Sequence, residues 1–253
     1  MKKRYGQHFL SDRNILQRIV RLAAISREDT VIEIGPGGGS LTRELASTAR
    51  RVIAIEIDRD LVPRLRASMP DNVEIIEADA LDTNLPQIAG EPFHLVGNLP
   101  YNVSTPLLKH FIATREHILD VTIMLQKEVA ERLRAAPGSE HYGPLSVLIQ
   151  YYATPIWGFT VPPGAFLPRP KVDSAVIRLE WKPGIPESRD FTDFVHRAFG
   201  SRRKKLINNL VTICPAHSRE QIAATLRTAG LSPDARAETL TIDQFLDVYN
   251  QLR

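Results

Sequence analysis

Short apolar runs alternate with helical patterns through the first half of the chain. Apolar residues recur at helical spacing in three segments, at 15–23, 41–46 and 59–68. Five apolar runs predict buried strands, at 31–34, 52–55, 73–76, 93–97 and 121–125. This alternation predicts an α/β fold, a doubly wound, mostly parallel, Rossmann-like sheet with helices on both faces. We expect Ser11 or Asp12 to cap the first helix.

The pattern becomes less regular after residue 125. A helical pattern over 126–134 is broken by Pro137-Gly138, and the apolar stretch 145–151 fits either a helix or a buried strand. A strand pair, 156–161 and 174–181, flanks a proline-rich loop. These segments complete the first predicted domain.

Prolines and a glycine in residues 182–186 suggest a linker. Only helical patterns follow it, at 191–199, 203–213, 220–229 and 242–252. We therefore predict a first domain over residues 1–182 and a small all-α C-terminal domain over residues 188–253.

Composition narrows the class of protein. Hydrophobic residues make up 43% and charged residues 24%, as in soluble globular chains. No apolar run approaches the roughly 18 residues of a membrane span, and the first residues do not lead into a secretory signal, so we expect a cytoplasmic protein without membrane contact. The single cysteine, Cys214, and histidines without ligand spacing imply no metal site.

Positive charge is clustered more than it is abundant. Lys+Arg exceed Asp+Glu by 32 to 29, and the cations gather in Lys2-Lys3-Arg4 and in Arg202-Arg203-Lys204-Lys205. Each cluster could be an ordinary solvated face, but a polyanion such as RNA would use both.

Four chemically distinctive residues lie at or just past the ends of the first four predicted strands. They are Gly35, Glu56, Asp79 and Asn98. Ligands of open α/β sheets bind outside the carboxyl ends of the strands, where the strand order reverses. We therefore expect these four residues to share one crevice.

Gly35 and Glu56, the first two of these four residues, suggest a nucleoside-containing cofactor. The run Gly35-Pro36-Gly37-Gly38-Gly39 allows close backbone approach, and Glu56, 21 positions after Gly35, can accept hydrogen bonds from two ribose hydroxyls. Asp79 could accept a hydrogen bond from an adenine amine, or it could simply be a turn residue. Nicotinamide cofactors and S-adenosylmethionine (SAM) both fit, but the loop lacks the third glycine of G-x-G-x-x-G, which favours SAM.

Asn98-Leu99-Pro100-Tyr101 carries the chemistry expected for a base with an NH2 group. The Asn98 side chain and the backbone carbonyl of Leu99 or Pro100 are acceptors, and the Tyr101 ring is a stacking surface. Acceptors that hold the amine out of plane stabilise the charge that develops on its nitrogen. The tetrapeptide taken alone favours an ordinary turn, and the residues upstream shift the interpretation toward a base-binding site.

Several motifs together closely resemble the SAM-dependent ribosomal RNA adenine-N6 dimethyltransferases, in particular those of the small subunit (16S). The resemblance covers nearly the whole chain. It is carried by Tyr5-Gly6-Gln7-His8-Phe9-Leu10, Glu33-Ile34-Gly35-Pro36-Gly37, residues 52–58, Glu77-Ala78-Asp79-Ala80, Gly97-Asn98-Leu99-Pro100-Tyr101-Asn102 and residues 166–174.

The resemblance implies a methyltransferase that dimethylates two neighbouring adenines in small-subunit rRNA during ribosome biogenesis, acting on the immature subunit. We expect it to be a monomer. Phe166 is implied to stack on the base opposite Tyr101, although a buried loop anchor is an alternative, and His8 stands where the family usually has Asn. The implied SAM contacts are His8, Leu10, Gly35, Glu56, Asp79 and Asn98, with Gly37 added from the glycine run.

Other functions remain open on the residues alone. One alternative is a methyltransferase that acts on DNA adenine or on large-subunit RNA, although DNA adenine enzymes generally have a second proline where Leu99 stands. A second alternative is a ribosome assembly factor whose binding, rather than methylation, matters. A third is an NAD-dependent oxidoreductase, on the fold alone.

Overall fold

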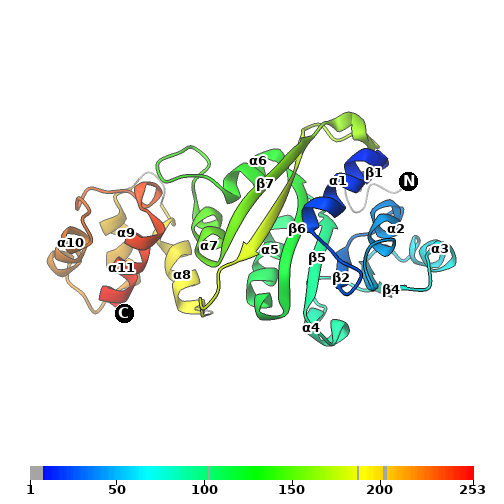
Figure 1. The fold of residues 1–253 in the computed structure, drawn as a ribbon. Coiled ribbons are helices and arrows are strands. Elements are labelled where there is room, and N and C mark those ends of the chain that lie inside the picture. Colours follow the sequence, from blue (N-terminus) through cyan, green and yellow to red (C-terminus); the bar gives the residue numbers. More distant parts are fainter. Residues whose placement is uncertain (1–7, 102, 187, 202–203) are drawn as a thin grey trace. The chain divides into compact units, whose positions relative to one another are not determined.

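The computed structural model describes residues 8–101, 103–186, 188–201 and 204–253 of the chain (Figure 1). The chain forms two compact units, Met1–Ala130 with Thr154–Trp181, and Glu131–Ala153 with Lys182–Arg253. The predicted linker region therefore begins where the first unit ends. Residues 131–153, which the predicted boundary places in the first domain, group with the C-terminal helices instead.

The first unit is built on a seven-stranded sheet of order β4-β3-β2-β5-β6-β9-β7. Pairing is parallel from β4 through β6, and β9 runs antiparallel to β6. This confirms the predicted fold class. The strands are β2 (Thr30–Ile34), β3 (Arg51–Glu56), β4 (Val73–Glu77), β5 (Phe93–Asn98), β6 (Ile118–Gln126), β7 (Ala153–Val161) and β9 (Ser174–Trp181).

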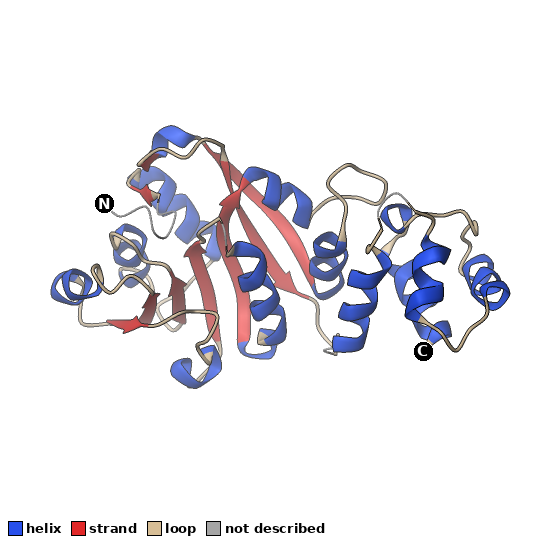
Figure 2. Ribbon diagram, turned by 180° about the vertical axis from the view of Figure 1, so that it is seen from behind, coloured by secondary structure: helices blue, strands red, loops and turns tan. Residues whose placement is uncertain are grey.

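Helices cover both faces of this sheet. On one face, α1 and α2 pack on a core that includes Val31, Val52 and Val96. Side chains alternate along a strand, so their neighbours Ile32 and Ile53 point to the opposite face, where Figure 2 shows α5. The helices of this unit are α1 (Arg13–Ala23), α2 (Ser40–Ala46), α3 (Val62–Ser68), α4 (Leu85–Ala89), α5 (Ser104–Ala113) and the start of α6 (Lys127–Leu133). Helices α4 and α5 lie in segments for which no helix was predicted.

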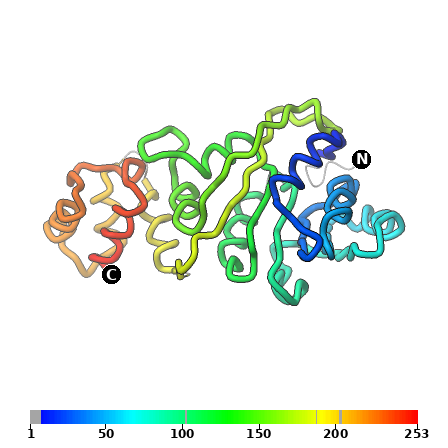
Figure 3. The backbone as a smooth tube through the Cα atoms, viewed as in Figure 1, coloured from blue at the N-terminus to red at the C-terminus, as the bar shows by residue number. Residues whose placement is uncertain are grey.

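A two-stranded ladder joins the N-terminal segment to the proline-rich loop. β1 (Phe9–Leu10) pairs antiparallel with β8 (Phe166–Leu167), and the Ser11 N–H donates to the Ala165 carbonyl at 3.3 Å. Figure 3 shows the two segments side by side. Asp12 caps α1 by accepting from the Asn14 and Ile15 N–H groups, so the strand leads directly into a fixed helix.

The second unit is helical. The stretch 145–151, whose sequence fits either a helix or a buried strand, is a helix. Its core contains Tyr142, whose hydroxyl donates to the Leu240 carbonyl at 2.7 Å, and the stacked rings of Phe199 and Phe245. Its helices are α7 (Pro144–Tyr152), α8 (Arg189–Ala198), α9 (Leu206–Ile213), α10 (Arg219–Thr228) and α11 (Ile242–Leu252). No helix in the described part of the chain is long and apolar enough to cross a bilayer.

Candidate active site

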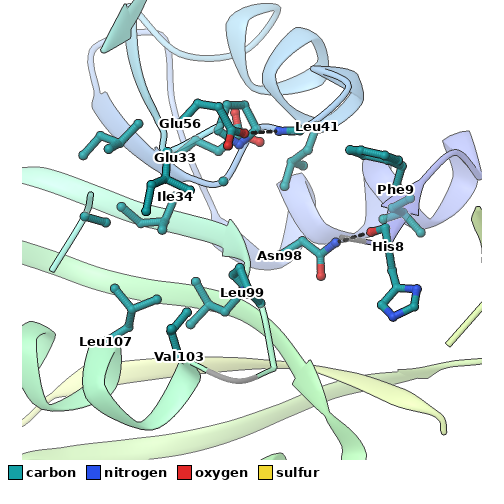
Figure 4. A pocket seen from close by; sticks show the side chains of 18 of the residues that line it. His8, Phe9, Glu33, Ile34, Leu41, Glu56, Asn98, Leu99, Val103 and Leu107 are labelled. Atoms are coloured by element: carbon teal, nitrogen blue, oxygen red, sulfur yellow. Dashed lines mark hydrogen bonds between the residues drawn. The ribbon is translucent and has the colours of Figure 1, made fainter. Parts of the chain in front are cut away.

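One pocket lies at the carboxyl ends of the parallel strands, where the strand order reverses between β2 and β5. Its empty space, open solvent at its mouth included, is about 1170 Å³. Figure 4 shows Glu33 and Glu56 near one end and Asn98 and His8 near the other. Of the predicted site residues, the pocket is lined by His8, Leu10, Gly35, Gly37, Glu56, Asp79, Asn98, Leu99, Pro100 and Tyr101.

The glycine loop has a conformation that depends on its glycines. Gly35 and Gly37 have φ of 71° and 55°, in the left-handed region that favours glycine. The Gly37 N–H donates to the Glu56 carboxylate at 3.0 Å, and a Cβ on Gly37 would lie 2.9 Å from the Phe9 ring. The loop is therefore held against the acidic end of the pocket, with its backbone accessible to a ligand.

Two buried carboxyl groups mark this end of the pocket. Glu56 is 2% exposed and also accepts from the Asp58 N–H at 2.9 Å. Burial raises its pKa, although the hydrogen bonds from Asp58 and Gly37 oppose that shift. Glu33 is 1% exposed, and it was not among the predicted site residues although it belongs to a recognised motif. Burial raises the pKa of Glu33 to about 8, with a smaller contribution from the charge of Glu56.

Asp79 serves a turn as well as the pocket. Its Oδ1 accepts from the Leu81 N–H at 2.9 Å, and its backbone carbonyl accepts from the Thr83 hydroxyl at 2.6 Å. Both alternatives considered for this residue, turn former and pocket residue, are thus compatible with its position.

Asn98 ends β5 with its side-chain amide fixed. Its Nδ2 donates to the His8 backbone carbonyl at 3.0 Å, the bond dashed in Figure 4. Because the nitrogen is committed to this bond, the orientation of Oδ1 is fixed too, and no donor among the described residues reaches that oxygen. The Leu99 N–H donates to the Met124 carbonyl at 3.1 Å, which fixes the backbone that follows.

The Tyr101 ring is fixed from two sides. Its hydroxyl shares a 2.7 Å hydrogen bond with that of buried Ser174, and burial raises its pKa while this bond partly opposes the shift. The His8 ring lies 5.7 Å away, tilted by 31°. His8 Nδ1 must donate in its 2.7 Å bond to Pro168, because a carbonyl oxygen only accepts. Two aromatic rings therefore border the Asn98 end.

Comparisons with known proteins agree with this geometry. A family model described as "Ribosomal RNA adenine dimethylase" matches residues 1–253. The chain belongs to this family. It is 43% identical over 254 residues to the protein named Ribosomal RNA small subunit methyltransferase A of Alkaliphilus metalliredigens, with 96% of this chain and 88% of the relative covered.

Two solved structures share the fold over nearly the full length. A dimethyladenosine transferase from Plasmodium falciparum has a TM-score of 0.84 at 26% identity, covering 95% of this chain and 96% of the other. The 23S rRNA methyltransferase ErmE has a TM-score of 0.74 at 30% identity, covering 96% and 99%. This member of the rRNA adenine dimethylase family is thus a SAM-dependent methyltransferase.

The residues present fit this cofactor. The glycine loop leaves room for close backbone contact, and the Glu56 carboxylate can accept hydrogen bonds from two ribose hydroxyls. Glu33 is buried at the same end of the pocket, and a hydrogen bond with the Thr42 hydroxyl partly opposes the rise of its pKa. No cluster of side chains suited to a metal ion occurs in the described ranges.

Phe166 lies in the hydrophobic core rather than in the lining of the pocket. The side chain is 3% exposed and belongs to the hydrophobic core together with Leu10, its partner in the β1–β8 ladder, and it does not line the pocket. The structure therefore favours the alternative role, a buried loop anchor. Phe9, which was not predicted, faces the pocket through its contact with Gly37.

The two basic clusters are only partly described. Lys2, Lys3, Arg4, Arg202 and Arg203 lie outside the described residues. Lys204 is exposed, and Lys205 forms a 2.6 Å ion pair with Asp234 although half of its side chain remains accessible. A phosphate at Lys205 would have to compete with this carboxylate.

The raised pKa of Glu33 gives a stability prediction. Between its ordinary value of 4.5 and about 8, the folded protein holds a proton that the unfolded chain releases, so stability falls as pH rises through this window. We expect Glu33→Gln, which resembles the neutral acid, to match the parent at pH 5 and to be more stable than the parent at pH 9. Urea unfolding at both pH values measures this, with the exposed Glu116→Gln as control. Equal midpoints of parent and Glu33→Gln at pH 9 would contradict a neutral Glu33.

Proposed function

We propose that the enzyme transfers methyl groups from SAM to the N6 amines of two adjacent adenines in small-subunit ribosomal RNA, dimethylating each. The observation that supports this most directly is the fixed Asn98 amide, whose Oδ1 is left as an acceptor in a pocket that also contains the nucleoside-binding Glu56. The 43% identity to a protein named for the small subunit, against 30% to one named for 23S rRNA, favours the small-subunit substrate.

The chain's own groups position the amine. An adenine amine is a weak nucleophile because its lone pair is delocalised into the ring. Asn98 Oδ1 and the backbone carbonyl of Leu99 or Pro100 would accept its N–H bonds and stabilise the charge that develops on nitrogen. Tyr101 offers a stacking surface worth about 1–3 kcal/mol. The bound cofactor supplies an electrophilic methyl group on a sulfonium, and no strong base is required before transfer.

The test of this function is a comparison of methyl acceptors. The protein is incubated with labelled SAM and, separately, immature small ribosomal subunits, naked small-subunit RNA, large-subunit RNA or DNA. Mass spectrometry of the digested product then locates the methyl groups. We expect dimethyladenosine at two neighbouring positions of the small-subunit RNA. Preferential labelling of large-subunit RNA or of DNA would refute the proposed substrate.

We further propose that the C-terminal unit contacts rRNA phosphates through Lys204 and Lys205, in an enzyme that acts as a cytoplasmic monomer. Replacing both lysines by Glu is expected to weaken RNA binding and to flatten its salt dependence, by a slope of about 0.7–0.9 for each lost phosphate contact. Binding is measured at several salt concentrations. Lys109→Glu, an exposed lysine on α5, is the control. An unchanged salt slope would remove the two lysines from the interface.

A further inference from the structure

The loop of residues 167–173, which begins with the last residue of β8 and leads into β9, exposes apolar side chains to solvent. Leu167 is 68% exposed, the largest fraction among the large hydrophobic side chains of the described residues, and Val172 is 46% exposed. Their neighbours Phe166 and Pro170 are buried, so the loop is held by some of its residues while it presents others. Solvent exposure of both side chains suggests that they contact a partner.

Both ends of this loop are attached to the Asn98 end of the pocket. At its start, Leu167 pairs with Phe9 across the β1–β8 ladder, and the Pro168 carbonyl accepts from the His8 ring. At its end, Ser174 bonds the Tyr101 hydroxyl. The exposed part of the loop therefore lies beside the rings that border the proposed amine site, not beside Glu56.

Two cations lie between the exposed apolar residues. Arg169 and Lys171 are both exposed, and no carboxylate in the described part of the chain is within ion-pair distance of either. This contrasts with Lys205, which is paired. Unpaired cations alternating with apolar side chains match a nucleic acid, which offers phosphates and base faces at short intervals.

We propose that this loop is a wedge for the RNA that flanks the target adenine. Leu167 packs against the base next to the adenine and occupies the space that the adenine leaves when it enters the pocket, while Arg169 and Lys171 contact the adjoining phosphates. Apolar side chains inserted between base steps partly unstack them in other nucleic-acid-binding proteins, and extrusion of a stacked base costs a few kcal/mol. The inference rests on the proposed function, because it assumes that an adenine enters at Asn98.

The experiment compares two RNA hairpins that contain the target adenines. The first is unmodified, and in the second the nucleotide beside the target is abasic, so that there is no neighbouring base to unstack. On the unmodified RNA we expect Leu167→Ser to lower kcat/KM about tenfold, and Leu167→Met, which keeps an apolar side chain, to retain most of it. On the abasic RNA we expect Leu167→Ser to match the parent.

Three further measurements complete the test. SAM affinity of Leu167→Ser should equal that of the parent, because the side chain lies outside the cofactor pocket. Val211→Ser, an exposed apolar residue on α9, is the matched control and should behave as the parent on both RNAs. Replacing Arg169 and Lys171 by Gln should lower the salt slope of RNA binding by about 1.4 on either RNA.

The outcomes separate the wedge from the proposed function. If Leu167→Ser lowered kcat/KM equally on both hairpins, or did not lower it on the unmodified one, the wedge would be overturned. If the parent enzyme methylated neither the hairpins nor intact small subunits, the proposed function would be refuted instead.

Discussion

Asn98→Ala is expected to abolish methyl transfer while SAM binding is largely retained. The substitution removes the acceptor Oδ1 and the Nδ2 donor that holds the His8 carbonyl. Loss of one group that stabilises developing charge typically lowers kcat by a factor on the order of 10²–10³. The backbone carbonyl of Asn98, which lies beside Gly35, is unchanged, so the cofactor side of the pocket should persist. Single-turnover methylation and calorimetric SAM titration measure the two effects.

The matched control is Asn84→Ala, which removes the side-chain cap of α4 outside the pocket. It should cost about 1 kcal/mol of stability and leave methyl transfer unchanged. If Asn98→Ala retained activity, Asn98 would not be the acceptor for the amine. If it lost SAM binding in the same proportion as activity, the residue would act mainly through the cofactor.

The predicted strands could be identified because parallel strands are buried on both faces and appear as continuous apolar runs. All five residues of β2 are buried, for example. Their ends then placed Gly35, Glu56, Asp79 and Asn98 in one pocket without any knowledge of contacts. Helix α5 was missed although Leu107, Leu108 and Phe111 recur at helical spacing, so its signal was present in the sequence.

The β1–β8 ladder could not be predicted in the same way. Each strand has two residues, too few for a period, and the paired residues are more than 150 positions apart. This pairing decides that Phe166 faces the core and that Leu167 faces solvent. The direction of the Phe166 side chain thus depends on a long-range contact, and its stacking on the base stays a prediction. Glu33 was missed because its position within a strand did not show that its side-chain carboxyl group faces the pocket.

Glu56→Gln is expected to weaken SAM binding by a factor on the order of 10–100, because hydrogen bonds to a charged acceptor contribute about 1.5–3 kcal/mol. The amide also places a donor where the carboxylate accepts from the Gly37 and Asp58 N–H groups. Calorimetry at pH 7 measures the loss. The exposed Glu77→Gln, on the neighbouring strand β4, is the matched control.

The pH dependence provides a second measurement on the same variant. Because burial raises the pKa of Glu56, protonation of its carboxylate begins at a higher pH than that of an exposed Glu, and SAM affinity of the parent should fall as pH is lowered below 7. Glu33, with a pKa of about 8, stays neutral through this range and does not contribute. The affinity of Glu56→Gln should change less over the same range, since its amide does not titrate. If the affinities of the parent and of Glu56→Gln changed by the same factor as pH is lowered, the pH dependence would not come from Glu56.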